Sequence, residues 1–266
     1  INTYESSPPA GRALVREAVE YGKARGIGAL YYSKHPFVGP VADFPDYDGP
    51  KLPPGRYPNE IRCWSLDAMR KRTAESFARL VADIGYTDVG FHDTDTGGFL
   101  NPAQWEDRCE VCRERWGDDY AAATIHKFRI WYEALKEHAP EARMHIVIYP
   151  YSLAIYTQEG AEAYLEERYG PGPGIPDAAQ RLREKWEAFY RRVGAELPED
   201  ITFCIREQTP DKVNAYRDLI GDRNIFIFFK LLADPWTAFY SECPRWAGTF
   251  FREWGVDTGY ATRGAV

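Results

Sequence analysis

Short apolar runs alternate with amphipathic helical segments along almost the whole of this 266-residue chain. The runs GALYYS, YTDVGFHD, RMHIVIYPY, ITFCIRE and NIFIFFK are typical of strands, and several of them are nearly continuous in apolar residues. Strands that are buried on both faces have this composition, and strands that alternate with helices are joined into a parallel sheet. The pattern therefore predicts an α/β fold in which helices cover a parallel sheet.

The helices between these strands have recognisable ends. The clearest covers residues 65–85, where apolar side chains form one stripe and Gly85 ends the helix. An earlier helix begins after two prolines and has Leu14, Ala18 and Tyr21 on one face. Further helices are expected at residues 118–140, 178–194, 210–220 and 243–254.

The number of strands favours a barrel. With INTY at residues 1–4 and DTGYATR at 257–263, the predicted strands number seven, whereas a (β/α)8 TIM-type barrel has eight. We therefore expect one barrel domain over residues 1–266, with its first strand upstream of this chain or missing from it. Because the chain begins with Ile1 rather than Met, it is either a processed protein or an excerpt of a longer one, and neither a secreted nor a cytoplasmic location is predicted.

Composition narrows the classes of partner. The net charge is −7, and the lysines and arginines form no cluster in the sequence. Both observations argue against binding to nucleic acid. No apolar run reaches the roughly 18 residues of a membrane span, so no membrane partner is expected. Cys109 and Cys112 form a CxxC pair without two further ligands at regular spacing, which favours thiols or a local disulfide over a metal site. No cofactor is expected.

Polar residues follow the predicted strands, and the clearest group is GFHDTDTGGF at residues 90–99. Asp93 and Asp95 have the period-two spacing of a strand, so their carboxylates are expected on one side, about 5–7 Å apart. Such proximity separates the two pKa values, which suits acid/base chemistry at an acetal. An Asx turn with a helix cap and a calcium loop are the structural alternatives.

Active sites of parallel α/β folds form where the carboxyl ends of the strands meet. A lone polar residue at such a position is more often a solvated loop residue, but here polar residues recur at several strand ends. Besides Asp93 and Asp95, the strand ends carry Lys34, His35, His92, Tyr149, Tyr151, Arg206, Glu207, Gln208, Lys230 and Arg263.

The helix ending in YGKARGI, the strand after it and the later strand that ends in an acidic pair resemble the barrel of the hexosaminidase and O-GlcNAcase clan of glycoside hydrolases. The segment NPAQWEDRCEVCRERWGDD is also similar to bacterial barrels related to that clan and to α-glucuronidases. The resemblance implies a glycosidase in which Asp93 orients the 2-acetamido group of a carbohydrate substrate and Asp95 is the general acid/base. Thr94 separates the two acids, whereas those of the clan are contiguous.

A mechanism with two carboxylates, in which Glu207 is the partner of Asp93 or Asp95, also satisfies the chemistry of glycoside hydrolysis. The remaining strand-end residues are then expected to bind the substrate, with the aromatic ones stacking on the sugar and the cations binding a carboxylate or sulfate. These residues are His35, His92, Tyr149, Tyr151, Lys230, Trp236 and Arg263.

Two other classes of function remain open. One is a barrel that binds a sugar without cleaving it. The other is a metal-dependent hydrolase or deacetylase with ligands among His92, Asp93, Asp95, His35 and His145. Against the metal site, His92 has the opposite strand parity to the two acids.

Overall fold

The parallel sheet is the centre of the structure, a computed structural model that describes Tyr4 and residues 7–34, 39–40, 60–61, 64–92, 105, 108–148, 157–205 and 210–227. Five strands lie in the order in which they occur along the chain, and every neighbouring pair is parallel. They are β1 (Leu30–Lys34), β4 (Asp88–His92), β5 (Arg143–Val147), β6 (Thr202–Ile205) and β7 (Ile225–Ile227). A sheet without reversal of strand order is the wall of a (β/α) barrel rather than a doubly wound fold, so the predicted fold class is confirmed.

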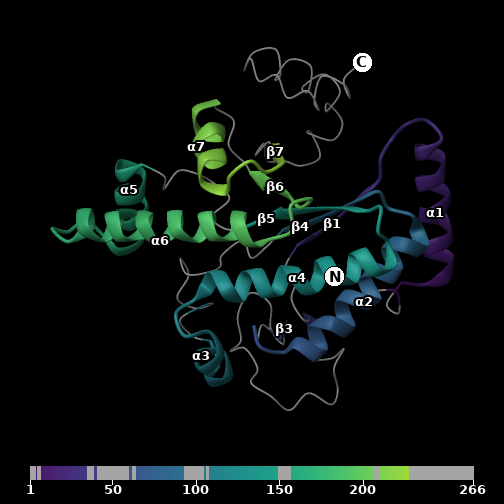
Figure 1. Cartoon of the computed structure of the whole chain (residues 1–266), viewed down its shortest axis with the longest axis horizontal. Helices are drawn as coiled ribbons and strands as arrows, with labels where there is room; N and C mark the ends of the chain where they lie inside the picture. Colours follow the sequence, from purple (N-terminus) through teal and green to yellow (C-terminus); the bar gives the residue numbers. More distant parts are fainter. Residues whose placement is uncertain are drawn as a thin grey trace.

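Helices cover one face of this sheet, and α2, α4 and α6 run side by side across it (Figure 1). The helices are α1 (Pro9–Lys23), α2 (Asp67–Ile84), α3 (Glu110–Trp116), α4 (Tyr120–His138), α5 (Gln158–Tyr169), α6 (Ile175–Glu196) and α7 (Pro210–Ile220). The sequence did not predict α5, because only Ala161 and Leu165 are buried in it, and two residues are too few to make a recognisable stripe. A short antiparallel pair, β2 (Gly39–Pro40) and β3 (Glu60–Ile61), lies within the segment that was expected to be irregular. The predicted strands at residues 1–4 and 257–263 and the helix at 243–254 lie outside the described residues, apart from Tyr4, which is in a turn.

An aromatic cluster fixes the helices on the sheet. Phe91 of β4 is fully buried, and its ring lies 5.3 Å from that of Phe77 in α2 and 5.0 Å from that of Trp131 in α4. Phe77 and Trp131 also meet each other edge to face at 5.5 Å. Aromatic pairs in this geometry add to the free energy gained from burial alone. One cluster therefore holds α2, α4 and β4 together and sets the height of both helices along the strand.

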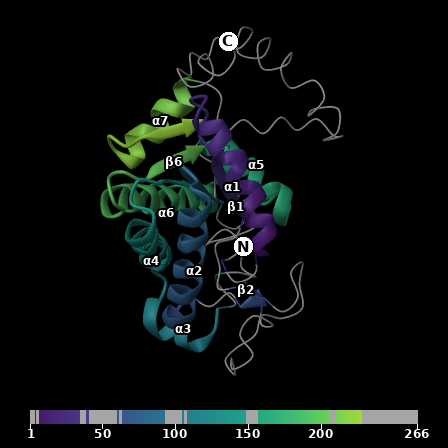
Figure 2. The same cartoon turned by 90° about the vertical axis from the view of Figure 1, so that its right-hand side faces the viewer.

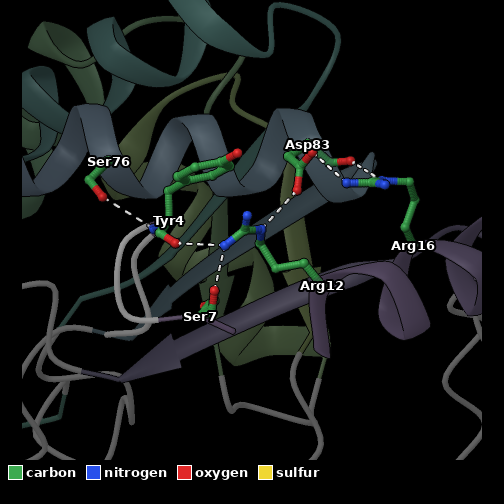
Figure 3. A network of polar contacts seen from close by, with 6 residues as sticks. All are labelled: Tyr4, Ser7, Arg12, Arg16, Ser76 and Asp83. Carbon is green, nitrogen blue, oxygen red and sulfur yellow. Dashed lines mark hydrogen bonds and ion pairs between the residues drawn. The ribbon is translucent and has the colours of Figure 1, made fainter. Parts of the chain in front are cut away.

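Helix α1 packs against α2 through a different face from the one that the sequence predicted. Leu14 and Tyr21 are 69% and 62% exposed, so the predicted stripe faces solvent. The side that contacts α2 carries Val19 and two arginines, which bind Asp83 near the end of α2 (Figure 3). The Arg12 Nε lies 3.2 Å from one carboxylate oxygen of Asp83, and the Arg16 Nε donates to the Asp83 carbonyl at 2.7 Å.

The same arginines also fix the segment before α1. The guanidinium of Arg12 donates to the carbonyl of Tyr4 at 3.1 Å and lies 4.1 Å from the centre of the Tyr4 ring. The amide of Tyr4 in turn donates to the hydroxyl of Ser76 at 3.1 Å. Hydrophobic periodicity carries no information about ion pairs and hydrogen bonds. The pattern therefore identified the helix but not the face that packs against α2. Seen from the side, α1 lies next to α2 at the β1 edge of the described sheet (Figure 2).

A buried hydrogen bond joins α6 to the end of β5. The hydroxyl of Tyr190 in α6 donates to the carbonyl of Ile148 at 2.9 Å, and both residues are buried. We expect Tyr190→Phe to lower the free energy of unfolding by about 1 kcal/mol, because the carbonyl loses its donor while the ring still packs. Urea unfolding of the variant beside wild type measures this loss. An unchanged midpoint would mean that the bond contributes nothing.

Within the described part of the chain, none of the helices is both long and apolar enough to cross a bilayer.

Candidate functional site

The carboxyl ends of the strands, where a barrel has its active site, bring together two residues that the sequence had placed there. Lys34 is the last residue of β1 and His92 is the last residue of β4. Lys34 lies directly opposite His92 in the register, and His92 lies opposite Val147 of β5. A lysine and a histidine therefore occupy adjacent positions at the carboxyl edge of neighbouring strands.

Most other predicted site residues lie outside the described residues. This applies to His35, Asp93, Asp95, Tyr149, Tyr151, Glu207, Lys230, Trp236 and Arg263. The strand bounds still give their place in the sequence: His35 and Asp93 come directly after β1 and β4, and Glu207 is the second residue after β6. Their roles stay predictions.

A charged cluster lies on the sheet face that the helices do not cover, at the amino ends of β4 and β5. The carboxylate of Asp88 binds His145 Nε2 at 2.7 Å and Arg143 Nε at 2.8 Å through one oxygen. Its other oxygen accepts from an Arg143 terminal nitrogen at 2.9 Å and from the Thr87 hydroxyl at 2.7 Å. Four contacts therefore satisfy a carboxylate whose side chain is only 8% exposed.

The electrostatics of this cluster keep Asp88 ionised. Burial raises the pKa of the Asp88 carboxyl, but hydrogen bonds from His145, Arg143 and Thr87, with the charge of Arg143, outweigh burial. The net result is a pKa well below the usual range of an aspartate. A carboxylate held in this state at the amino ends of barrel strands ties strands together and is not placed for catalysis.

The sequence analysis did not identify Asp88 or Arg143 as important, and it considered His145 only as a metal ligand. The structure corrects that idea, because His145 binds Asp88 at the end of the sheet opposite to His92. No group of three or more His, Cys, Asp or Glu residues among the described ranges could hold a metal ion. The missed signal was the period-two spacing of Arg143 and His145, which places both on one face of their strand.

A second polar cluster connects the start of α2 with α3 and α4. Asp67 binds His126 Nε2 at 2.8 Å and an Arg115 terminal nitrogen at 2.9 Å. Burial raises the pKa of Asp67, but hydrogen bonds from Arg115 and His126 outweigh it, so the pKa is lowered. Because these side chains are about 30% exposed, the cluster is worth little in stability.

The predicted CxxC pair lies beside this cluster and consists of thiols. Cys109 precedes α3 as its N-cap residue, and Cys112 is buried within the helix. The Cys112 sulfur accepts a hydrogen bond from the Ser65 hydroxyl at 3.3 Å, and that hydroxyl accepts one from the Trp116 indole at 3.1 Å. The structure therefore agrees with structural thiols and not with a local disulfide.

A cavity of about 190 Å³ opens between the start of α4 and α6. Asp119 in its wall caps α4 by accepting from the Ala122 amide at 2.9 Å, and it is also paired with Arg192 of α6. The volume is below that of typical small-molecule sites, and Asp119 and Arg192 form an ion pair with each other. The cavity has no feature of an active site.

Comparison with known proteins gives little beyond the fold. No protein-family model and no curated protein sequence matches this chain. Among solved structures, the chain is similar to morphinone reductase in complex with tetrahydroNAD, with 12% identity and a TM-score of 0.37 over 83% of this chain and 67% of that one. A likeness at this score says nothing about the activity of this chain.

The expected glycoside hydrolase is corrected by the absence of a matching family. The resemblance to the hexosaminidase and O-GlcNAcase clan implied a family relationship, yet no protein-family model and no curated protein sequence matches. The resemblance rested on the order of helices and strands, which many unrelated enzymes share. The assignment as a glycosidase is therefore wrong, and a carbohydrate substrate is not supported.

Proposed function

We propose that this chain is an enzyme that binds a small anionic substrate at the carboxyl edge of its sheet and carries out acid/base chemistry there. The observation that carries the proposal is the adjacent position of Lys34 and His92 at the ends of β1 and β4. In barrels this edge holds the catalytic residues, whatever the reaction. The proposal treats residues 1–266 as one catalytic domain.

The proposed roles follow from residue chemistry. Lys34 is an ammonium donor for a carboxylate or phosphate, and Lys230 and Arg263 would add further positive charge. The imidazole of His92 can both donate and accept a proton, which suits proton transfer. Asp93, directly after His92, and Glu207, shortly after β6, supply carboxylates that could act as general base or acid. Asp95 would be the second acid of the segment after β4.

Ligand binding tests the proposal first. Wild type is titrated with malonate, succinate and inorganic phosphate while its melting temperature is followed, because a ligand that binds the folded state raises that temperature. We expect at least one of these anions to bind, and Lys34→Met and His92→Asn to weaken its apparent affinity by about tenfold or more, as loss of a charge-assisted hydrogen bond does. Lys71→Met, which removes an exposed lysine from α2, is the matched control.

The chemical step is tested on the carboxylate that binds. In D2O, an enzyme that abstracts a proton next to a carboxylate exchanges that proton for deuterium, which NMR follows directly. We expect Asp93→Asn to slow this exchange by about a hundredfold or more. Binding that is identical in wild type, Lys34→Met and His92→Asn would overturn the proposed site, and absence of any anion binding would overturn the substrate class.

A further inference from the structure

Two thiols, Cys109 and Cys112, occupy neighbouring positions at the start of α3. Cys109 is the N-cap residue, and its carbonyl accepts a hydrogen bond from the Arg113 amide at 3.0 Å. Cys112 is therefore the third residue of the helix. Side chains at these two positions meet in a capping box, in which each reaches the backbone of the other residue. The two sulfur atoms thus belong to positions whose side chains approach each other.

The spacing brings the pair within reach of a disulfide. Residues three apart on a helix have Cβ atoms about 5–6 Å apart, whereas a disulfide requires about 3.5–4.5 Å. Cys109 has extended backbone angles, with φ of −63° and ψ of 162°, so it stands half outside the helix. A small adjustment at Cys109 can therefore close the gap while α3 keeps its hydrogen-bonded turns.

The two thiols differ in how far solvent reaches them. Cys109 is half-buried, whereas Cys112 is fully buried. Glu110 and Val111 between them are exposed, so α3 presents this side to solvent next to Cys109. Thiol–disulfide exchange begins at the thiol that the oxidant can reach. Cys109 is thus placed to attack a dissolved disulfide, and Cys112 is placed to attack Cys109 from within the protein.

We propose that Cys109 and Cys112 form a reversible dithiol–disulfide site that exchanges with small-molecule disulfides. The Cys109 thiolate attacks one sulfur of the small disulfide, so that an S–S bond joins Cys109 to one half and the other half leaves as a thiolate. Cys112 then gives its proton to solvent and attacks the Cys109 sulfur, which releases the second half as a thiolate. The protein loses two electrons and two protons, and the two small thiols gain them. The proposal is independent of the anion site at the carboxyl edge of the sheet.

The bond would also change a contact outside α3. In the thiol form, the Cys112 sulfur accepts from the Ser65 hydroxyl, which in turn accepts from the Trp116 indole. A disulfide turns the Cys112 sulfur toward Cys109 and so draws it away from Ser65. Because Ser65 lies just before α2, oxidation would be felt at the start of that helix and at the indole of Trp116.

Proteolysis allows the pair to be measured separately from the other cysteines. Trypsin cuts after Arg108 and Arg113, which releases Cys109 and Cys112 together in the peptide CEVCR, whereas Cys63 is released in CWSLDAMR. The folded full chain is equilibrated with mixtures of oxidised and reduced glutathione, and the remaining thiols are alkylated before digestion. With oxidised glutathione in about tenfold excess, we expect more than half of CEVCR to lack the alkyl groups and to be two hydrogen atoms lighter than the dithiol peptide. Dithiothreitol should reverse the change.

Two variants separate the steps of the exchange. Cys112→Ser removes the resolving thiol, so the reaction should stop with glutathione bound to Cys109. Cys109→Ser leaves the buried thiol alone, and we expect it to react with oxidised glutathione at least about tenfold more slowly than wild type. Cys112→Ala takes the place of Cys112→Ser should that variant not fold. Equal rates in Cys109→Ser and wild type would overturn the assigned order of attack.

Cys204 of β6 is the internal control. It is buried, and burial raises the pKa of its thiol, so it should stay a thiol at every glutathione ratio. Oxidation of Cys204 in parallel with the pair would show that the reaction needs unfolding, which would overturn the proposal. CEVCR that keeps two alkylated thiols at every ratio would overturn it as well.

A spectroscopic readout shows that the bond forms in the folded protein. In ¹⁵N-labelled protein, the indole N–H resonance of Trp116 should shift on oxidation in wild type and stay in place in Cys109→Ser. A disulfide in CEVCR without any shift of this resonance would mean that the bond forms only after unfolding, and the proposed site would then be refuted.

Discussion

Gly194→Ala should lower the free energy of unfolding by about 3 kcal/mol or more, the largest loss that we expect from any single methyl group in this chain. A β-carbon at Gly194 would lie 2.6 Å from the Cα of Ile220 and 2.7 Å from its carbonyl carbon. Real contacts of this kind essentially never occur, and the obstacle is backbone, which cannot rotate away as a side chain can. The helices α6 and α7 would have to separate, which costs more than ordinary overpacking.

Urea unfolding monitored by circular dichroism measures the effect, with Gly11→Ala as the matched control. Gly11 lies in α1 with no heavy atom within 4 Å of the added carbon, so alanine there should stabilise the protein by about 0.5–1 kcal/mol. If Gly194→Ala unfolded within about 0.5 kcal/mol of wild type, the close approach of α6 to the end of α7 would be refuted.

Asp88→Asn should cost about 2 kcal/mol at pH 7, because it removes the charge that Arg143 and His145 bind. The loss stays below that of a fully buried ion pair, since the Arg143 side chain is 62% exposed and can be solvated. The asparagine keeps the shape of the side chain, so the loss reports on charge rather than on packing.

The pH dependence of this loss has a definite sign. The pKa of Asp88 is depressed in the folded state, so its stabilisation is fully present above the unfolded pKa of about 4 and is lost as the pH falls below that value. The difference between wild type and Asp88→Asn should therefore be constant above about pH 5 and shrink at lower pH. Unfolding midpoints between pH 3 and pH 7 measure it, with the exposed Asp222→Asn as control. A difference of equal size at pH 3 and pH 7 would show that the charge is not its source.

The hydrophobic periodicity of the sequence predicted helices and strands well where a buried stripe coincides with a clear end signal. The stripe in residues 65–85 appears as α2, and Gly85 ends it with a φ of 81°, a conformation that favours glycine. The apolar runs appear as parallel strands in their expected order. Periodicity failed for α5, which has two buried residues, and for the packing face of α1, where Arg12 and Arg16 bind Asp83.

The sequence could predict only where in the fold the candidate site lies, at the carboxyl ends of the strands. The predicted strand ends lie within one residue of the observed ones, since β4 ends at His92 and β1 ends at Lys34, while the roles of the site residues stay predictions. The chemistry was not predictable, because the order of elements in a barrel is common to many activities. That order led to a glycosidase family that no matching family model supports.

The order of the strands in the sheet also affects how the sheet forms while the chain is being synthesised. Within the five-stranded sheet, each strand pairs with the strand of that sheet synthesised before it, and 55 residues separate Asp88 from its partner Arg143. At roughly 5–20 residues per second, a ribosome makes that stretch in about 3–11 s. The edge of each newly made strand therefore waits only seconds for its neighbour, and the sheet can grow from β1 to β7 while translation continues.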